Sequence, residues 1–559
     1  MEHVTRRSFL KGVGACGAIY LVDPMRVLAQ STRATDARIE VLIDEAIATI
    51  NPDIYGHFTE HLGGVIYGGI WVGERSSVPN IDGIRAALVE ALKRIKPPVI
   101  RYPGGCFADS YDWRDGVGAR ERRPRRTNFW VDDPDMRAPA DAPQRFEPNQ
   151  FGTNEFMRFC RLVGAEPYLA VNVRGLGAQA FYEWVEYCNA PAGTTTLAEL
   201  RASGPVPSRE PFRVRFWGIG NESWGCGGNL TPEEYAMEFR RFTAAVPSYG
   251  VDLKFIASGA NSDDLNWTRG FFARTREKGE WMFDRIYGWG LHHYSWNVSG
   301  GRTTDWRAGK GDAIKFDEEQ YYELLREADR IESLIDRHWA VMGEYDRRHR
   351  VKLVVDEWGT WYRSGTEIDP THLLGQQSTM RDALVAALTL DTFNRHADKV
   401  VMANIAQLVN CLQSLFLTRE DRFLLTPTYH VFEMFMPHMG AQAVRTVFAA
   451  PSLTYRRNGQ PARFWGLSGS ASLRDKLLTL TVVNPHLAES RATEIAVRGA
   501  RIARAQARVL VADDVHAHNT FENPRAVEPR DEAVEVGANG VLVYDFRPAS
   551  VTRLQLSLT

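Results

Sequence analysis

The chain has 559 residues, of which 44% are hydrophobic and 24% charged, a balance typical of a soluble globular protein with room for a large domain and a smaller one. Its formal net charge is -2, so the composition does not favour binding of nucleic acid or of another polyanion. Aromatic residues make up 11%, which suits a sugar-binding protein, although most of these rings are expected to serve in the core.

Residues 1–29 are predicted to be a twin-arginine signal peptide. The motif Arg6-Arg7-Ser8-Phe9-Leu10-Lys11 precedes a short apolar stretch over residues 12–21, and Val27-Leu28-Ala29 offers a cleavage site. That stretch is too short to span a membrane, so we expect no stable membrane anchor. Lipidation at Cys16 is a less favoured alternative. The sequence thus predicts export to the periplasm, or secretion.

Five cysteines follow Cys16, and they are Cys106, Cys160, Cys188, Cys226 and Cys411. An odd number, in a chain that folds in the reducing cytoplasm before twin-arginine export, argues against a disulfide framework. No cysteine or histidine pair has the spacing of zinc ligands. We therefore expect neither a metal nor a cofactor.

Short apolar runs alternate with longer helical patterns between about residue 50 and residue 410. Apolar residues at helical spacing over 82–96 predict one helix, and the capping-box sequence Thr231-Pro232-Glu233-Glu234 predicts the start of another. Eight strand-then-helix units favour an α/β fold, a (β/α)8 barrel rather than an open sheet. The predicted strands cover residues 54–58, 99–102, 167–173, 216–221, 255–258, 286–293, 353–357 and 401–408.

Beyond about residue 424, β-rich segments separated by turn residues predict a β-sandwich resembling a jelly roll. Residues 38–50 are also strand-like, and we expect them to join that sandwich. The expected boundaries are 1–29 for the signal, 30–50 for the N-terminal strand segment, 51–423 for the barrel and 424–559 for the sandwich. Inserts such as 120–149 would form loops above the barrel, and the sequence leaves open whether they make a pocket or a cleft.

Two predicted strands, the fourth and the seventh, end in the sequences Gly220-Asn221-Glu222 and Asp356-Glu357-Trp358-Gly359. The carboxyl ends of barrel strands carry function, and these two tips face each other across the barrel mouth. One isolated glutamate there is more often an ion-pair partner, but two at matching tips favour a functional pair. Two carboxyl groups about 5 Å apart suit double displacement at an anomeric carbon. The sequence therefore predicts a retaining glycoside hydrolase in which Glu222 and Glu357 are the catalytic pair.

Six motifs closely resemble family 51 of the clan A glycoside hydrolases, the α-L-arabinofuranosidases. In chain order they are Ile54-Tyr55-Gly56-His57-Phe58-Thr59-Glu60-His61-Leu62-Gly63, Ile100-Arg101-Tyr102-Pro103-Gly104-Gly105, Gly220-Asn221-Glu222, Leu291-His292-His293-Tyr294, Asp356-Glu357-Trp358-Gly359 and Ala403-Asn404-Ile405-Ala406-Gln407-Leu408-Val409-Asn410. The resemblance implies an exo-acting enzyme that releases terminal arabinose from arabinoxylan, arabinan or their oligosaccharides, and a homo-oligomer, often a hexamer in relatives. An endoglucanase or β-xylosidase is the alternative on the same machinery, and a noncatalytic carbohydrate-binding protein is a remote one.

The resemblance also implies that Glu357 is the nucleophile and Glu222 the acid/base, because in clan A the acid/base follows an asparagine on strand four and the nucleophile ends strand seven. It implies roles for the residues around them as well. Glu60 and Asn221 would hydrogen-bond sugar hydroxyls, and Gln407 would hold the furanose from the opposite side. Tyr294 would keep the nucleophile oriented and ionised. His292 either orients the acid/base or is an ordinary barrel histidine with satisfied hydrogen bonds.

One position departs from the family pattern. After Arg101-Tyr102-Pro103-Gly104-Gly105 many relatives carry asparagine, whereas this chain has Cys106. A thiol is a weaker hydrogen-bonding group than an amide, so a weaker contact between Cys106 and the sugar is expected. Cys226 would also lie near the pocket. Neither is interpreted as a nucleophile, because no paired base is evident.

Overall fold

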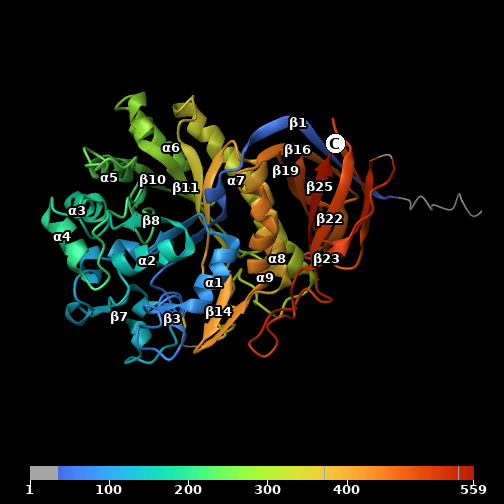
Figure 1. The fold of residues 1–559 in the computed structure, drawn as a ribbon. Helices are drawn as coiled ribbons and strands as arrows, with labels where there is room; N and C mark the ends of the chain where they lie inside the picture. Colours follow the sequence, from blue (N-terminus) through green and yellow to red (C-terminus); the bar gives the residue numbers. More distant parts are fainter. Residues whose placement is uncertain (1–34, 370–371, 539) are drawn as a thin grey trace, which may run out of the picture. The chain divides into compact units, whose positions relative to one another are not determined.

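The computed structural model describes residues 35–369, 372–538 and 540–559 (Figure 1). The predicted signal peptide and Cys16 lie outside these residues. Within the part of the chain that is described, none of the helices combines the length and the apolar character needed to cross a bilayer.

Eight parallel strands close into a barrel, which confirms the predicted fold class. They occupy the predicted positions because each is buried almost throughout, and parallel strands covered on both faces are apolar runs. In chain order the barrel strands are β2 (Gly56–Phe58), β5 (Val99–Tyr102), β8 (Glu166–Val171), β9 (Phe216–Ile219), β10 (Lys254–Asn261), β11 (Ile286–Ser295), β12 (Lys352–Thr360) and β13 (Val400–Ile405). The sheet closes where β13 pairs with β2.

Helices follow most barrel strands and cover the outside of the barrel (Figure 1). They are α1 (Ala86–Ile95), α2 (Thr153–Val163), α3 (Ala178–Asn189), α4 (Thr196–Ser203), α5 (Pro232–Phe242), α6 (Leu265–Arg276), α7 (Glu318–Tyr345), α8 (Met380–Arg395) and α9 (Pro427–Phe435). Helix α5 begins with the expected capping box between Thr231 and Glu234. Helix α1 begins later than predicted, because β3 (Asn80–Ile81) and β4 (Ile84–Arg85) form a short hairpin just before it.

The predicted C-terminal sandwich domain is confirmed, and its strands form a sheet with the order β23-β22-β25-β20-β19-β16-β1-β21-β24. Strand β1 pairs antiparallel with β16 and parallel with β21. The strands are β1 (Ala37–Thr49), β16 (Gln442–Ala449), β19 (Ser468–Arg474), β20 (Leu477–Asn484), β21 (Arg491–Arg498), β22 (Ile502–Leu510), β23 (Arg530–Ala533), β24 (Leu542–Phe546) and β25 (Ser550–Leu558). The division at residues 50 and 423 stays a prediction of the domain boundaries.

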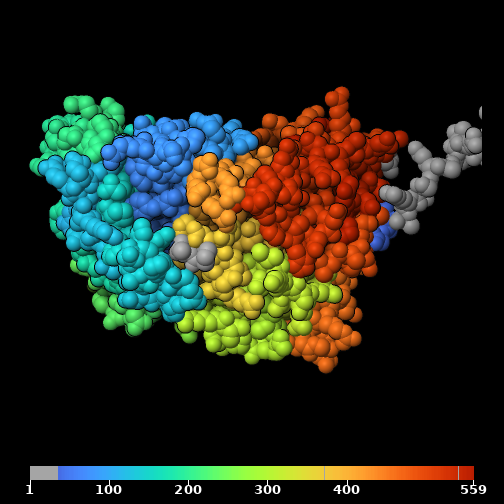
Figure 2. Space-filling model, turned by 90° about the horizontal axis from the view of Figure 1, so that it is seen from below, coloured from blue at the N-terminus to red at the C-terminus, as the bar shows by residue number. Residues whose placement is uncertain are grey.

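The sandwich packs on the barrel through α8 and α9, which contact β19, β22 and β25. In Figure 2 the C-terminal residues, coloured red, gather on one side of the face shown. Asp391 of α8 is buried at this contact and accepts hydrogen bonds from the hydroxyls of Ser470 and Thr481. These bonds tie one barrel helix to two strands of the sandwich.

The insert over residues 120–149 is a folded loop with its own anchors. Its strands β6 (Arg126–Thr127) and β7 (Phe146–Glu147) pair, Arg123 forms a buried ion pair with Glu155 at 3.0 Å, and Asn128 donates to the carbonyl of His61. The loop is therefore fastened both to α2 and to the segment after β2. The remaining hairpins pair β14 (Phe416–Arg419) with β15 (Arg422–Leu425) and β17 (Leu453–Arg457) with β18 (Gln460–Phe464).

Candidate active site

Glu222 and Glu357 meet at the carboxyl ends of the barrel strands. Glu357 is part of β12 and Glu222 lies three residues after β9, and one ligand atom each from these carboxylates and from His292 all lie within 4.8 Å of one another. The side chain of Glu357 is 7% exposed and that of Glu222 is 19% exposed. The structure thus brings together the two carboxylates that sequence analysis singled out, one deeper than the other.

Glu357 is surrounded by hydrogen-bond donors and positive charge. Arg101 donates from Nη1 to Oε1 at 2.7 Å, and the hydroxyl of Tyr294 donates to Oε2 at 2.8 Å. Burial acts to raise the pKa of Glu357, but the charges of His292 and Arg101 and these two hydrogen bonds outweigh it, so the pKa is lowered. Glu357 is therefore held as a carboxylate, the form that a nucleophile requires.

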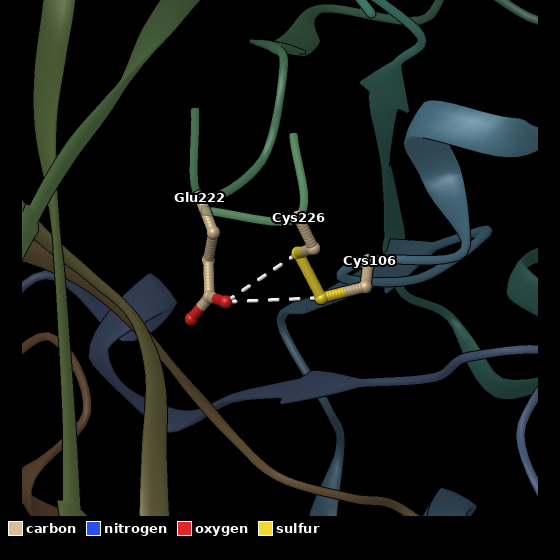
Figure 3. A group of neighbouring side chains, drawn as sticks. All are labelled: Cys106, Glu222 and Cys226. Carbon is tan, nitrogen blue, oxygen red and sulfur yellow. Dashed lines mark hydrogen bonds between the residues drawn. A yellow bond between two sulfur atoms is a disulfide. The ribbon is translucent and has the colours of Figure 1, made fainter. Parts of the chain in front are cut away.

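Glu222 lies between an imidazole and a disulfide. Its Oε1 is 2.9 Å from Nδ1 of His292, whereas Oε2 faces the sulfur atoms of Cys106 and Cys226 (Figure 3). The backbone of Glu222 is left-handed, with φ +41°, and forms part of a tight turn. The turn is so close at position 227 that only glycine fits there. A Cβ on Gly227 would lie 1.8 Å from the carbonyl oxygen of Asn221. This turn directs the Glu222 side chain toward the barrel mouth.

Asn221 is fixed from two sides. Its Oδ1 accepts a hydrogen bond from Nη2 of Arg101 at 2.6 Å, and its backbone N–H donates to Oδ2 of Asp109 at 2.9 Å. Asp109 also accepts from the backbone N–H groups of Val173 and Arg174, although burial raises its pKa to about 7 against these bonds. Asp109 therefore joins the ends of β8 and β9 and holds Asn221 next to Glu222.

Glu60 and Gln407 form the opposite side of the site. Oε1 of Glu60 accepts from the backbone N–H groups of Gly105 and Phe107, both at 3.1 Å, and Oε2 accepts from Nε2 of Gln407 at 2.8 Å. Burial and the charge of Glu357 raise the pKa of Glu60 to about 8 in spite of these bonds. Among the described residues the buried Oε1 of Gln407 has no hydrogen-bond partner.

The backbone beside Glu60 passes close to the catalytic candidates. A Cβ on Gly105 would lie 2.8 Å from Oε1 of Glu357, and one on Gly104 would lie 2.7 Å from Cγ of Glu60. Side chains at either position would displace these carboxylates. The two glycines thus explain why the loop after β5 can carry Cys106 to the edge of the site.

Cys106 and Cys226 form a disulfide, which sequence analysis did not predict. The odd cysteine count did not exclude it, because one bridge leaves three of the five cysteines unpaired, and the free cysteines of the described chain are Cys160, Cys188 and Cys411. The bond removes the thiol proton that a hydrogen bond from Cys106 to a sugar would need. Cys106 therefore offers the site a sulfur surface in place of a donor.

Arg101 and Asp109 both shape the site, although neither was among the predicted site residues. Arg101 is a charged residue within a buried strand, and such a charge requires an anionic partner. That requirement is the feature of the sequence from which a role for Arg101 in the site could have been predicted. Asp109 carries no comparable signal, because its partners are backbone groups of distant strands.

Two groups of side chains have ligand atoms close enough for a metal ion, namely Glu222 with His292 and Glu357, and Glu222 with Cys106 and Cys226. In the first group Arg101 already binds Glu357, so a cation would face a neighbouring positive charge. In the second the two sulfurs are bonded to each other, and sulfur ligates metals as the thiolate. Neither group has the chemistry of a good metal site.

Comparison with known proteins gives consistent matches. Family models of the alpha-L-arabinofuranosidase 1 domain and the alpha-L-arabinofuranosidase C-terminal domain match residues 91–308 and 356–550. The chain is 36% identical over 496 residues to the intracellular exo-alpha-L-arabinofuranosidase of Bacteroides ovatus, covering 88% of this chain and 90% of that protein. The GH51 arabinofuranosidase from Xanthomonas axonopodis pv. citri is 34% identical, with a TM-score of 0.84, over 93% of this chain and 100% of that structure. An arabinose complex of the alpha-L-arabinofuranosidase from Thermotoga maritima is 31% identical, with a TM-score of 0.75, over 93% of this chain and 100% of that structure.

The predicted export to the periplasm or outside the cell is contradicted by these relatives. The Bacteroides ovatus protein is named intracellular, and so is an exo-alpha-(1->5)-L-arabinofuranosidase of Acetivibrio thermocellus that is 32% identical over 396 residues, 68% of this chain and 72% of that protein. The prediction was wrong because paired arginines followed by a short apolar stretch are a common pattern, and their presence alone does not make a segment an export signal.

The identity to the Bacteroides ovatus protein extends over most of both chains, and the two family models match the parts that hold Glu222 and Glu357. The chain belongs to the family 51 α-L-arabinofuranosidases and is a glycoside hydrolase.

Proposed function

We propose that this enzyme removes terminal α-L-arabinofuranosyl residues by retaining double displacement, with Glu357 as nucleophile and Glu222 as acid/base. The observation that carries the proposal is the approach of the two carboxylates, with oxygen atoms within 4.8 Å of each other. Retaining glycosidases place their carboxyl groups about 5–5.5 Å apart, whereas inverting enzymes need roughly 6.5–9.5 Å to admit a water molecule.

The surroundings of the two glutamates support different roles. Glu357 is kept ionised by Arg101 and Tyr294, so it can attack the anomeric carbon and form a glycosyl ester. Glu222 has one oxygen facing the disulfide and greater exposure, so it can deliver a proton to the leaving oxygen. Once the ester has formed and Glu222 has given up its proton, Glu222 can act as the base that activates water in the second step.

The groups around the carboxylates suit a small polyhydroxylated ring. Asn221 and Glu60 present polar atoms beside the reacting pair, and the buried Oε1 of Gln407 is an acceptor for a sugar hydroxyl. Hydrogen bonds to the 2-hydroxyl strengthen as charge develops at the anomeric carbon. We propose that these three residues bind the furanose, while His292 orients Glu222 and Cys106 contacts the sugar through its sulfur.

The proposed substrates are arabinoxylan, arabinan and their oligosaccharides, because relatives are named exo-α-L-arabinofuranosidases and one is named for the (1→5) linkage. By family resemblance we also propose a homo-oligomer, which light scattering coupled to gel filtration would measure. A preference for a β-xyloside or a glucan would favour the alternative specificities.

The test is hydrolysis of 4-nitrophenyl α-L-arabinofuranoside beside the β-xyloside and the β-glucoside. Glu357→Ala and Glu222→Ala should lose activity, and azide should restore Glu222→Ala and give the α-arabinosyl azide, the configuration of the substrate. Glu90→Ala, an exposed glutamate of α1, is the matched control and should behave as wild type. Release of β-arabinose as the first product, followed by NMR, would refute retention.

A further inference from the structure

We propose that the Cys106–Cys226 disulfide positions the carboxyl group of the acid/base Glu222, so that reducing the bond slows the hydrolysis of arabinosides whose leaving group needs a proton. The inference rests on the proposed role of Glu222 and goes beyond it. It assigns Cys106 and Cys226 a part in the reaction, and this part is lost when the disulfide is reduced and regained when it is oxidised.

The disulfide joins two loops that are far apart in sequence. Cys106 follows the Gly104-Gly105 turn after β5, and Cys226 lies four residues after Glu222 in the turn after β9. In the barrel β8 lies between β5 and β9, so the bond spans the end of β8. The turn that carries Glu222 is thus linked covalently to the loop that borders Glu60 and Glu357.

The sulfur atoms contact the oxygen of Glu222 that His292 does not. Oε2 is 3.6 Å from Sγ of Cys226 and 3.8 Å from Sγ of Cys106, whereas Oε1 is 2.9 Å from the imidazole (Figure 3). A disulfide sulfur has no proton to donate and is only a weak acceptor. A hydrogen bond along either line therefore requires the proton to be on Oε2.

The disulfide and His292 confine the carboxyl group of Glu222 from two sides. Oε1 is held by the imidazole of His292 from β11, and Oε2 borders the two sulfur atoms. Glu357 from β12 also contacts His292, and Tyr294 lies behind them. Two thiols in place of the disulfide would release the turn that carries Glu222.

The bond is open to exchange with a small thiol. Cys106 and Cys226 are both partly exposed, whereas Cys160, Cys188 and Cys411 are buried. A dithiol attacks one sulfur to give a mixed disulfide, and its second thiol displaces the first. The protein bond gains two electrons, the two protons of the dithiol end on Cys106 and Cys226, and the dithiol becomes a cyclic disulfide.

Relatives in the family are named as enzymes of a compartment that contains reducing thiols. Two relatives are named intracellular enzymes, and cytosolic thiols keep most protein cysteines reduced. A disulfide that persists or forms transiently in such a compartment is typically catalytic or redox-sensing.

The experiment compares oxidised and dithiothreitol-reduced enzyme on two substrates, with thiols counted under denaturing conditions. The dinitrophenyl arabinoside has a leaving group that needs no proton, whereas an arabino-oligosaccharide depends on the general acid. We expect reduction to lower kcat/KM on the oligosaccharide about tenfold, part of the roughly 10²–10⁴ that a general acid supplies, and on the dinitrophenyl substrate less than twofold.

Cys226→Ala, which breaks the bond and keeps the sulfur of Cys106, should show the reduced behaviour without dithiothreitol and no further response to it, and it replaces the reduced enzyme if reduction causes unfolding. Cys188→Ala, which removes a buried free thiol, should respond like wild type. Equal slowing of both substrates, no slowing of either, or six free thiols in the unreduced full chain would each overturn the proposal. Failure of the proposed function would show separately, as full activity of Glu222→Ala on the oligosaccharide.

Discussion

Arg101 and Glu357 form an ion pair of 2.7 Å in which both side chains are almost completely buried. The same guanidinium donates from Nη2 to Asn221, so one strand of the barrel supports the ends of two others. A buried ion pair stabilises little by itself, but removal of one partner leaves an uncompensated charge. The ion pair therefore keeps Glu357, the proposed nucleophile, ionised and fixed.

Arg101→Met should lower kcat/KM on 4-nitrophenyl α-L-arabinofuranoside by at least about 100-fold, because the loss of a buried charge partner costs about 3–5 kcal/mol. The pKa of Glu357 should rise, so the acidic limb of the kcat/KM profile should move to higher pH. Arg123→Met removes another buried arginine that pairs with Glu155, and it should alter stability without moving that limb. An acidic limb unchanged in Arg101→Met would contradict the assignment.

Tyr294→Phe removes one hydrogen bond to Glu357 and leaves the ring in place. A hydrogen bond to a charged group contributes about 1.5–3 kcal/mol, so we expect a loss of roughly 10–100-fold in kcat/KM and a smaller upward shift of the acidic limb. Tyr55→Phe, which removes a buried bond to Asn394 away from the site, is the matched control. The role of Tyr294 would be refuted if both variants changed the pH profile alike.

Gln407→Ala tests binding of the sugar ring. The variant removes the unpartnered acceptor Oε1 and the donor to Glu60, so KM should rise and kcat should fall as well, because contacts to sugar hydroxyls strengthen in the transition state. We expect a loss of about 10–100-fold in kcat/KM. Gln413→Ala, another buried glutamine, bonds the backbone of Thr360 and should affect melting temperature more than KM.

The sequence was sufficient to predict the barrel and the approach of Glu222 and Glu357, for a physical reason. Barrel strands are apolar because both faces are covered, and a glutamate near the carboxyl end of such a run stands out. Glu222 and Glu357 are of this kind. The position of the seventh strand and its polar tip could therefore be predicted without any knowledge of what they contact.

The supporting residues could not be predicted in the same way, because their importance lies in contacts between distant segments. Arg101 meets partners 120 and 256 positions away, and the cysteines of the disulfide are 120 positions apart. Asp109 bonds backbone groups, which leave no trace in residue type. Such pairings are fixed by the closure of the barrel, so they became visible only in three dimensions.

Asp391 makes the contact between barrel and sandwich sensitive to pH. Burial raises its pKa to about 7 from an ordinary value of 3.8, although Ser470 and Thr481 donate hydrogen bonds to it. Between these pH values the folded protein binds more protons than the unfolded chain, so the stabilising effect is complete below about pH 4 and is lost as pH rises through 7. The free energy of unfolding should accordingly fall between pH 5 and pH 8.

Asp391→Asn should reduce the fall in the free energy of unfolding between pH 5 and pH 8 by about 1–3 kcal/mol, because asparagine still accepts from both hydroxyls and does not ionise. Melting temperatures across pH 5–8 would measure the effect. A residual slope is expected in the variant, since the raised pKa values of Glu60 and Asp109 act in the same direction. Asp252→Asn, at an exposed aspartate, should melt in parallel with wild type. If Asp391→Asn also runs parallel to wild type, Asp391 does not carry a proton at the contact between the two domains.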